Sequence, residues 1–199
     1  MNFAEQLVYW YLRLNGFFPI TNFVLHHGAE HRTSDADLVA VRFPYVSEEI
    51  GGAPTDWDER FNDQWGIGLM TETVGLIVEV KSGGWNRNDL NDSTREWQVR
   101  DGLKRMGMIS PEQLEDAVAE LNRGPVTRVG GFTSGKLFVG NGRVPDDTTW
   151  LHLQLNDADQ FVRRRMRTYR DRKFRDRLFF QGDLIQYLAW KGGRSDGGR

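Results

Sequence analysis

An acidic and a basic side chain close a strongly apolar stretch of this chain. Residues 74–81 read Val-Gly-Leu-Ile-Val-Glu-Val-Lys, a run that predicts a buried central strand ending at Glu79 and Lys81. Side chains alternate along a strand, so Glu79 and Lys81 are expected on the same side. Removing two charges from water is costly unless both find partners. A metal site would compensate the cost, with Glu79 as an oxygen ligand and Lys81 holding or activating a water.

Such a site needs a second carboxylate, and the sequence offers one at the start of another apolar segment. Asp37 opens the run Asp-Leu-Val-Ala-Val-Arg-Phe over residues 37–43, which predicts a strand ended by Pro44. Asp35 could share the site, although a loop or turn position is favoured for it. Mg²⁺ typically takes one or two protein carboxylates and completes its shell with water and phosphate oxygens.

The order of these residues resembles the D…ExK signature of the PD-(D/E)XK, or restriction-endonuclease-like, nuclease superfamily. Asp37 is followed by Leu-Val-Ala, and the later apolar run leads into Glu79-Val80-Lys81. Two features depart from the family pattern. Ala36 takes the place of the proline, and a long interval separates Asp37 from Glu79, so an insertion must loop out between the two strands.

Two expected helices extend the resemblance. Glu5 is followed by Tyr11-Leu12 and Gly16, as in family members that carry a metal-facing glutamate on the first helix. Gln98 matches the polar residue that members often place on the helix after the ExK strand. Both residues also have ordinary explanations. Glu5 suits a helix-capping box, and Gln98 suits a solvated helix position.

The resemblance implies hydrolysis of a phosphodiester bond. Asp37 and Glu79, with the Val80 carbonyl, would bind Mg²⁺ or Mn²⁺, and Glu5 would join them directly or through water. Lys81 would orient the attacking water and stabilise charge developing on the phosphate. By analogy with such folds, DNA is favoured over RNA as substrate, and a restriction or defence effector is the expected role.

Basic residues are dense between positions 163 and 177. This run predicts a helix face that follows a phosphate backbone. The residues expected to bind nucleic acid are Arg163, Arg164, Arg167, Arg170 and Lys173. A solvated helix face or an intersubunit patch would explain the same run. The interleaved Phe161, Met166 and Tyr169 are expected to make core contacts rather than stack on bases.

Other interpretations of these residues stay open. Glu79 and Lys81 could be an ordinary ion pair at a strand end. The chain would then be a catalytically inactive nuclease-fold module that binds nucleic acid or a protein partner. A small-molecule enzyme that uses the same metal site is a third alternative.

Two further motifs predict little chemistry. The G-x-x-x-x-G-K pattern over residues 130–136 lacks the Ser or Thr that should follow, and the next residues predict a strand where a P-loop needs a helix. The four histidines, at positions 26, 27, 31 and 152, lack the spacing of a zinc site and are expected to be structural or surface residues.

Composition limits the class of protein and its compartment. The net charge is −2, so any contact with nucleic acid must come from local clusters of basic residues. The sequence has no cysteine, which removes disulfides and thiolate chemistry and agrees with a cytoplasmic protein. No apolar run approaches the roughly 20 residues that cross a bilayer.

The order of expected elements is helix, strands, helices, strands, helices, which predicts an α/β fold with a mixed central sheet flanked by helices. We expect a single restriction-endonuclease-like domain over residues 1–191. Within it, residues 46–73 form an insertion or lid loop and 156–191 a C-terminal helical part with the basic face. Residues 192–199 form a flexible tail. The family resemblance covers roughly residues 2–106.

Single-stranded and double-stranded substrates stay open as alternatives, as do sequence-specific and non-specific recognition. Endonucleases that cut both strands often pair, so a homodimer stays open, as does an activating partner protein.

Overall fold

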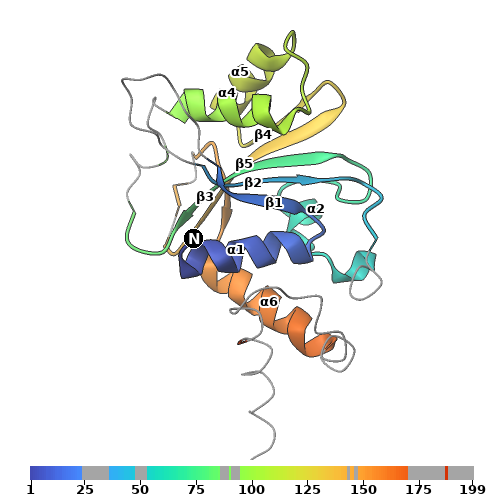
Figure 1. Cartoon of the computed structure of the whole chain (residues 1–199), viewed down its shortest axis with the longest axis vertical. Helices are drawn as coiled ribbons and strands as arrows, with labels where there is room; N and C mark the ends of the chain where they lie inside the picture. Colours follow the sequence, from blue (N-terminus) through green and yellow to red (C-terminus); the bar gives the residue numbers. More distant parts are fainter. Residues whose placement is uncertain are drawn as a thin grey trace, which may run out of the picture.

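A mixed sheet of six strands lies between two helical layers in the computed structural model of this chain (Figure 1). The structure describes residues 1–23, 36–47, 53–85, 90, 95–142, 144–145, 148–169 and 187. The strands are β1 (Phe18–Phe23), β2 (Ala36–Arg42), β3 (Val74–Lys81), β4 (Val126–Val129), β5 (Phe132–Gly140) and β6 (Leu151–Leu153). The predicted α/β class with a mixed sheet is confirmed. The end of the predicted C-terminal helical part, residues 170–191, and the predicted tail over 192–199 lie outside the described residues, apart from Tyr187.

The strand order is β1-β2-β3-β5-β4, with β6 also paired to β5. The β1–β2 and β2–β3 pairs are antiparallel, whereas β3–β5 and β5–β6 are parallel. The predicted central strand over 74–81 is β3, which is buried along its length except at Lys81, where it is half-buried. Its continuous apolar character follows from burial on both faces.

Two helices cover each face of the sheet. The helices α1 (Phe3–Leu14) and α6 (Leu155–Thr168) pack on one face, and α4 (Arg95–Met106) and α5 (Leu114–Arg123) on the other (Figure 1). Alternation along β3 separates two cores, since Leu76 and Val78 pack with α1 and α6 while Ile77 packs with α4 and α5. The first helix begins with the predicted capping box, in which Asn2 accepts from the Glu5 amide.

Two local turns shape the second half of the fold. The Gln113 N–H donates to the Ser110 carbonyl in a turn that leads directly into α5, which starts at Leu114. The strands that follow are β4 and the longer β5. They are joined through Gly130 and Gly131, whose φ angles of 66° and 83° suit only glycine readily. The P-loop-like pattern therefore lies in a hairpin, as expected from its missing Ser or Thr.

The segment 46–73, expected to be an insertion or lid loop, contributes to the core in its described portion. Residues 53–73 contain the short helices η1 (Pro54–Asp56) and α2 (Arg60–Asp63). Four apolar side chains of this segment are buried and pack with α1, namely Trp57, Phe61, Ile67 and Leu69. Because its apolar side chains are buried, this segment forms part of the core on the α1 side of the domain and is not a lid over the surface.

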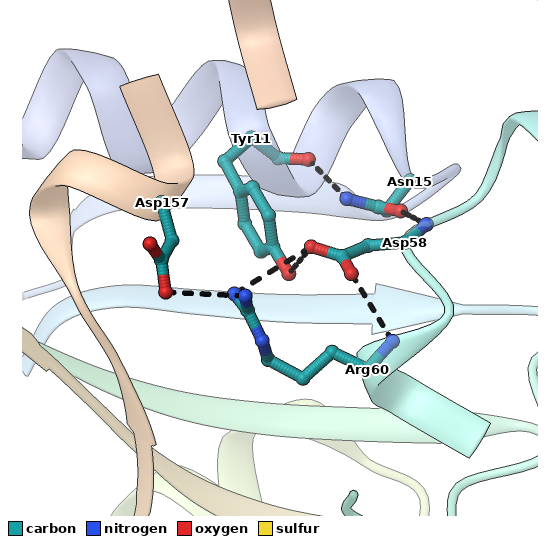
Figure 2. A network of polar contacts seen from close by, with 5 residues as sticks. All are labelled: Tyr11, Asn15, Asp58, Arg60 and Asp157. Carbon is teal, nitrogen blue, oxygen red and sulfur yellow. Dashed lines mark hydrogen bonds and ion pairs between the residues drawn. The ribbon is translucent and has the colours of Figure 1, made fainter. Parts of the chain in front are cut away.

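A polar network holds the same segment to the helices (Figure 2). The Tyr11 hydroxyl donates to Asp58 Oδ2 at 2.9 Å, and the Asp58 amide donates to Asn15 Oδ1 at 2.7 Å. Arg60 then bridges Asp58, at 3.7 Å, and Asp157 of α6, at 3.1 Å. The network joins the segment to both helices of this layer.

Replacing Tyr11 with Phe should weaken the attachment of this segment. Tyr11 is fully buried, and burial followed by the Asp58 charge raises the pKa of its hydroxyl, so the hydroxyl stays a proton donor. We expect Tyr11→Phe to lower the free energy of unfolding by about 1–2 kcal/mol, because Asp58 loses a buried donor. The measurement is urea denaturation, with the half-buried Tyr9→Phe as control. Equal losses in the two variants would show that the Asp58 hydrogen bond contributes nothing.

Candidate active site

Two acidic residues from different strands meet where β3 ends. Because β2 runs antiparallel to β3, and Leu38 pairs with Val78 as the last pair of their ladder, Asp37 lies beside the carboxyl end of β3. The Asp37 side chain continues the ladder, since its Oδ2 accepts a hydrogen bond from the Val80 amide at 2.6 Å. The structure thus brings Asp37 and the Glu79–Lys81 segment together, as the sequence predicted.

Glu79 and Lys81 form a close ion pair at this edge. Lys81 Nζ lies 2.6 Å from Glu79 Oε1. The Glu79 side chain is only 9% exposed and that of Lys81 is 37% exposed, so solvent reaches the pair from the lysine. Lys81 also lowers the pKa of Asp37, which places the ammonium near both carboxylates rather than away from Asp37.

The electrostatics of the site centre on Asp37. Burial is the largest cause that raises its pKa, to about 6, and the nearby negative charge of Glu79 comes second. The hydrogen bond from Val80 and the charge of Lys81 oppose this rise, while Glu5 adds to it. At neutral pH the negative charges of Asp37 and Glu79 are therefore held close together, and Lys81 and the Val80 amide neutralise them only in part. Such an environment favours a bound cation.

Glu5 is close enough to influence the site but is engaged elsewhere. Its carboxylate accepts from the Asn2 amide at 3.0 Å and completes the capping box of α1. The capping explanation of Glu5 is confirmed. Its charge nevertheless raises the pKa of Asp37, so α1 directs a third carboxylate towards the same edge.

Gln98 is buried at the level of Glu79. A Cβ on Gly102 would lie 2.8 Å from Ile77 Cδ1, and a Cβ on Gly75 would lie 2.8 Å from Met106 Sδ. The helix α4 therefore runs antiparallel to β3 and against it. Gln98 lies four residues before Gly102 on α4, and Glu79 lies two residues after Ile77 on β3. Both steps cover about 6 Å in the same direction, so Gln98 lies at the level of Glu79.

The burial of Gln98 decides between two interpretations of this residue. Gln98 is 5% exposed, which excludes the solvated helix position. A buried amide on the face of α4 that approaches β3 can donate to and accept from groups beside Glu79.

The oxygen donors suit a small hard cation. Mg²⁺ needs one or two carboxylates, and Asp37 and Glu79 provide two, with the Val80 carbonyl at the same edge. Among the described residues, however, no group of three or more acidic or histidine side chains is arranged to hold a metal. A cation at this edge would replace the contacts that Asp37 makes with the Val80 amide and Glu79 makes with Lys81.

The described part of the predicted basic face differs in exposure from one arginine to the next. On α6, Arg164 and Arg167 are exposed, while Arg163 pairs with Asp159 at 2.6 Å. Arg165 belongs to the same basic run, but it is 2% exposed and donates to the Asp56 carbonyl. Arg170 and Lys173 lie outside the described residues.

The structure also locates one of the four histidines, His152, and a buried lysine, Lys136. His152 stacks on Phe138 with ring centroids 5.8 Å apart, and burial lowers its pKa, which agrees with a structural residue. The other three histidines and Asp35 lie outside the described residues.

Lys136 is 4% exposed, and burial lowers its pKa to about 8. Its ammonium donates to Thr149 at 3.0 Å. The one signal in the sequence was a lysine inside an apolar strand.

Comparisons with models of protein families, with curated proteins and with solved structures found no match to this chain. Within the part of the chain that the structure describes, no helix combines the length and apolar character needed to cross a bilayer. The function must therefore be inferred from the residues and their geometry.

The raised pKa of Asp37 makes this residue a cost to stability at neutral pH. Below about pH 4 the carboxyl is protonated whether the chain is folded or unfolded. As the pH rises through about 6, the folded state resists ionisation and loses stability relative to the unfolded state. A rise of about two pKa units corresponds to about 3 kcal/mol, and solvent screening at this half-buried position reduces it to about 1–2 kcal/mol.

We therefore expect Asp37→Asn to stabilise the fold by about 1–2 kcal/mol at pH 8 and to have little effect at pH 4. The amide oxygen of Asn can still accept from Val80, so the substitution removes mainly the charge. Urea denaturation in chelator at both pH values measures the effect, with the exposed Asp63→Asn as control. A gain that does not depend on pH would contradict the electrostatic cause.

Proposed function

We propose that this chain is a metal-dependent nuclease that hydrolyses phosphodiester bonds at Asp37, Glu79 and Lys81. The observation that carries the proposal is the convergence of two carboxylates and one ammonium at the end of the central strand, where the pKa of Asp37 is raised to about 6. The same residues, in the same chain order, give the sequence its resemblance to PD-(D/E)XK nucleases. The mixed sheet between helical layers is compatible with that fold.

Each residue has a distinct role in this proposal. Asp37, Glu79 and the Val80 carbonyl hold Mg²⁺ or Mn²⁺, which when bound acidifies a water and neutralises phosphate charge. The side chain of Lys81 is more accessible to solvent than that of Glu79, at 37% against 9% exposed. It exchanges its contact with Glu79 for one with the attacking water or the phosphate, and stabilises the charge that develops there. Gln98 and Glu5 support the two carboxylates from α4 and α1.

DNA is the favoured substrate, and the exposed arginines of α6 are its proposed phosphate contacts. Arg164 and Arg167 project from the outer layer of the domain, where they are accessible to a polyanion. A role as a restriction or defence effector follows from the resemblance alone, as do a homodimeric state and a requirement for an activating partner.

A catalytically inactive module is the second candidate. It is favoured by the 2.6 Å ion pair between Glu79 and Lys81, which satisfies both charges without a metal. It is also favoured by the described residues' lack of a ready-made cluster of three metal-ligating side chains. Such a module would use the fold and the α6 arginines to bind nucleic acid or a protein.

Cleavage assays distinguish the two candidates. With Mg²⁺ or Mn²⁺, the wild type should cleave plasmid, linear or single-stranded DNA, and Lys81→Ala and Asp37→Ala should each lower the rate by at least about 10²-fold. Binding of the same DNA in chelator should be largely retained, because the α6 arginines remain in both variants and Lys81→Ala removes only one phosphate contact. The exposed Lys104→Ala on α4 is the matched control for loss of a lysine.

The results separate three cases. Metal-dependent cleavage that is abolished in both site variants and kept in Lys104→Ala supports the nuclease. Cleavage at the wild-type rate in every variant would point to a contaminant or another site. Salt-sensitive binding without cleavage by the wild type would favour the inactive module.

The contribution of α6 can be measured through the salt dependence of binding. Removing one arginine that binds a phosphate should reduce the slope of log affinity against log salt by about 0.9 for duplex DNA and about 0.7 for a single strand. We expect the double variant Arg164→Ala/Arg167→Ala to weaken binding and to reduce the slope by about 1.8 for duplex DNA and about 1.4 for a single strand. Arg163→Ala should change it less, because Asp159 already neutralises Arg163. Equal slopes in the wild type and the double variant would remove α6 from the interface.

A further inference from the structure

Trp85 lies next to the candidate active site, just after the turn that follows β3. In the parallel β3–β5 pair, Lys81 is opposite Gly140. The Trp85 indole N–H donates to the carbonyl of Asn141, the next residue, at 2.8 Å. The indole therefore lies against the chain immediately beyond the residue that pairs with Lys81.

Contacts with β5 and with the turn after it hold the indole in place. Its ring packs against Phe138 with centroids 4.8 Å apart and an interplanar angle of 63°. Gln154, the N-cap residue of α6, donates to the Gly142 carbonyl at 2.7 Å, so the turn that accepts the indole hydrogen bond is itself tied to the next element. Gly142 has a φ of 110°, and a Cβ there would lie 3.6 Å from the indole nitrogen. The ring is thus positioned before any ligand arrives, which lowers the entropic cost of binding.

Trp85 is more exposed than a side chain that only covers Phe138 would need to be. Phe138 beneath it is fully buried and pairs with Glu79 in the sheet. Trp85 itself is only half-buried, and the Ser82–Gly84 turn before it is exposed. A hydrophobic cover for Phe138 would not need an indole fixed through its N–H with part of its ring in solvent. A rigid, partly exposed indole beside a phosphate-binding site is a platform on which a base can stack.

We infer that Trp85 stacks on a nucleobase adjacent to the phosphate bound at Lys81, and that the substrate is single-stranded nucleic acid. This inference rests on the proposed nuclease function and specifies its substrate. In a duplex both faces of each base are covered by neighbouring bases, whereas a single strand can turn a base outwards onto an aromatic ring. Recognition of this kind tolerates any base, because every base has a π face.

The test is binding of a fluorescently labelled single-stranded oligonucleotide by the full chain in chelator, followed by anisotropy. Trp85→Ala should weaken binding by about 10- to 100-fold, the effect usual for loss of one stacked base. Trp85→Phe should recover most of the affinity, because it restores an aromatic face and still covers Phe138. The control is Tyr45→Ala, since Tyr45 is 90% exposed and lies beyond Arg42, at the end of β2 remote from Asp37.

Oligonucleotides with a single abasic position, moved along the strand, separate stacking from a structural effect. One abasic position should weaken binding by the wild type and have no further effect on Trp85→Ala, since that variant has no indole on which the missing base could stack. Binding to a duplex of the same sequence should change less than about threefold in Trp85→Ala, because its bases are not free to stack on the indole.

The outcomes separate this inference from the proposed function. If the wild type cleaves and binds single strands but Trp85→Ala matches Tyr45→Ala, stacking is overturned and the nuclease proposal stands. The same conclusion follows if, at every abasic position, Trp85→Ala weakens binding to the abasic strand as much as to the intact strand. If the wild type neither binds nor cleaves any nucleic acid, both are overturned.

Discussion

The burial of the Glu79 carboxylate is the constraint on which the candidate site depends. Glu79 is 7% exposed and lies on the central strand, where a lone charge would be strongly destabilising. Lys81 compensates it at 2.6 Å. The compensation is incomplete, since the same negative charge helps to raise the pKa of Asp37 on the neighbouring strand. Keeping two carboxylates this close costs stability at neutral pH, because the Asp37 carboxyl resists ionisation in the folded state.

The two helical layers surround this edge in different ways. On one face, α1 directs Glu5 towards Asp37 while its capping box fixes the start of the helix. The polar network around Asp58 attaches the 53–73 segment to α1 and α6, so the side chains of that segment complete the core beneath the sheet. On the other face, α4 runs against β3 and brings Gln98 to the level of Glu79. The site is therefore made by rigid elements, which is the arrangement that best fixes reactive groups.

Local signals account for the parts of the fold that were predicted well. The strand at 74–81 was correct to the residue because a central strand is apolar on both faces. The first helix was correct because its capping pair lies within four residues of sequence. The turn that begins at Ser110 likewise leads into α5 through residues close together in the sequence. The contact of Asp37 with the end of β3 was expected only from the chain order of the two strands that carry acidic residues, because no local signal shows which strands pair.

The sequence by itself determined the first helix, the strands that carry Asp37 and Glu79, and that Glu79 and Lys81 share one side of a buried strand. It did so because alternation, capping and turn residues act over a few positions. Tertiary structure alone decided that Arg165 is buried, that Gln98 faces the sheet and that the 53–73 segment belongs to the core. It also placed Trp85 beside Lys81 through the turn after β5. These outcomes depend on contacts between residues far apart in the chain, and the free energy of such contacts is set by the surfaces that meet and not by local composition.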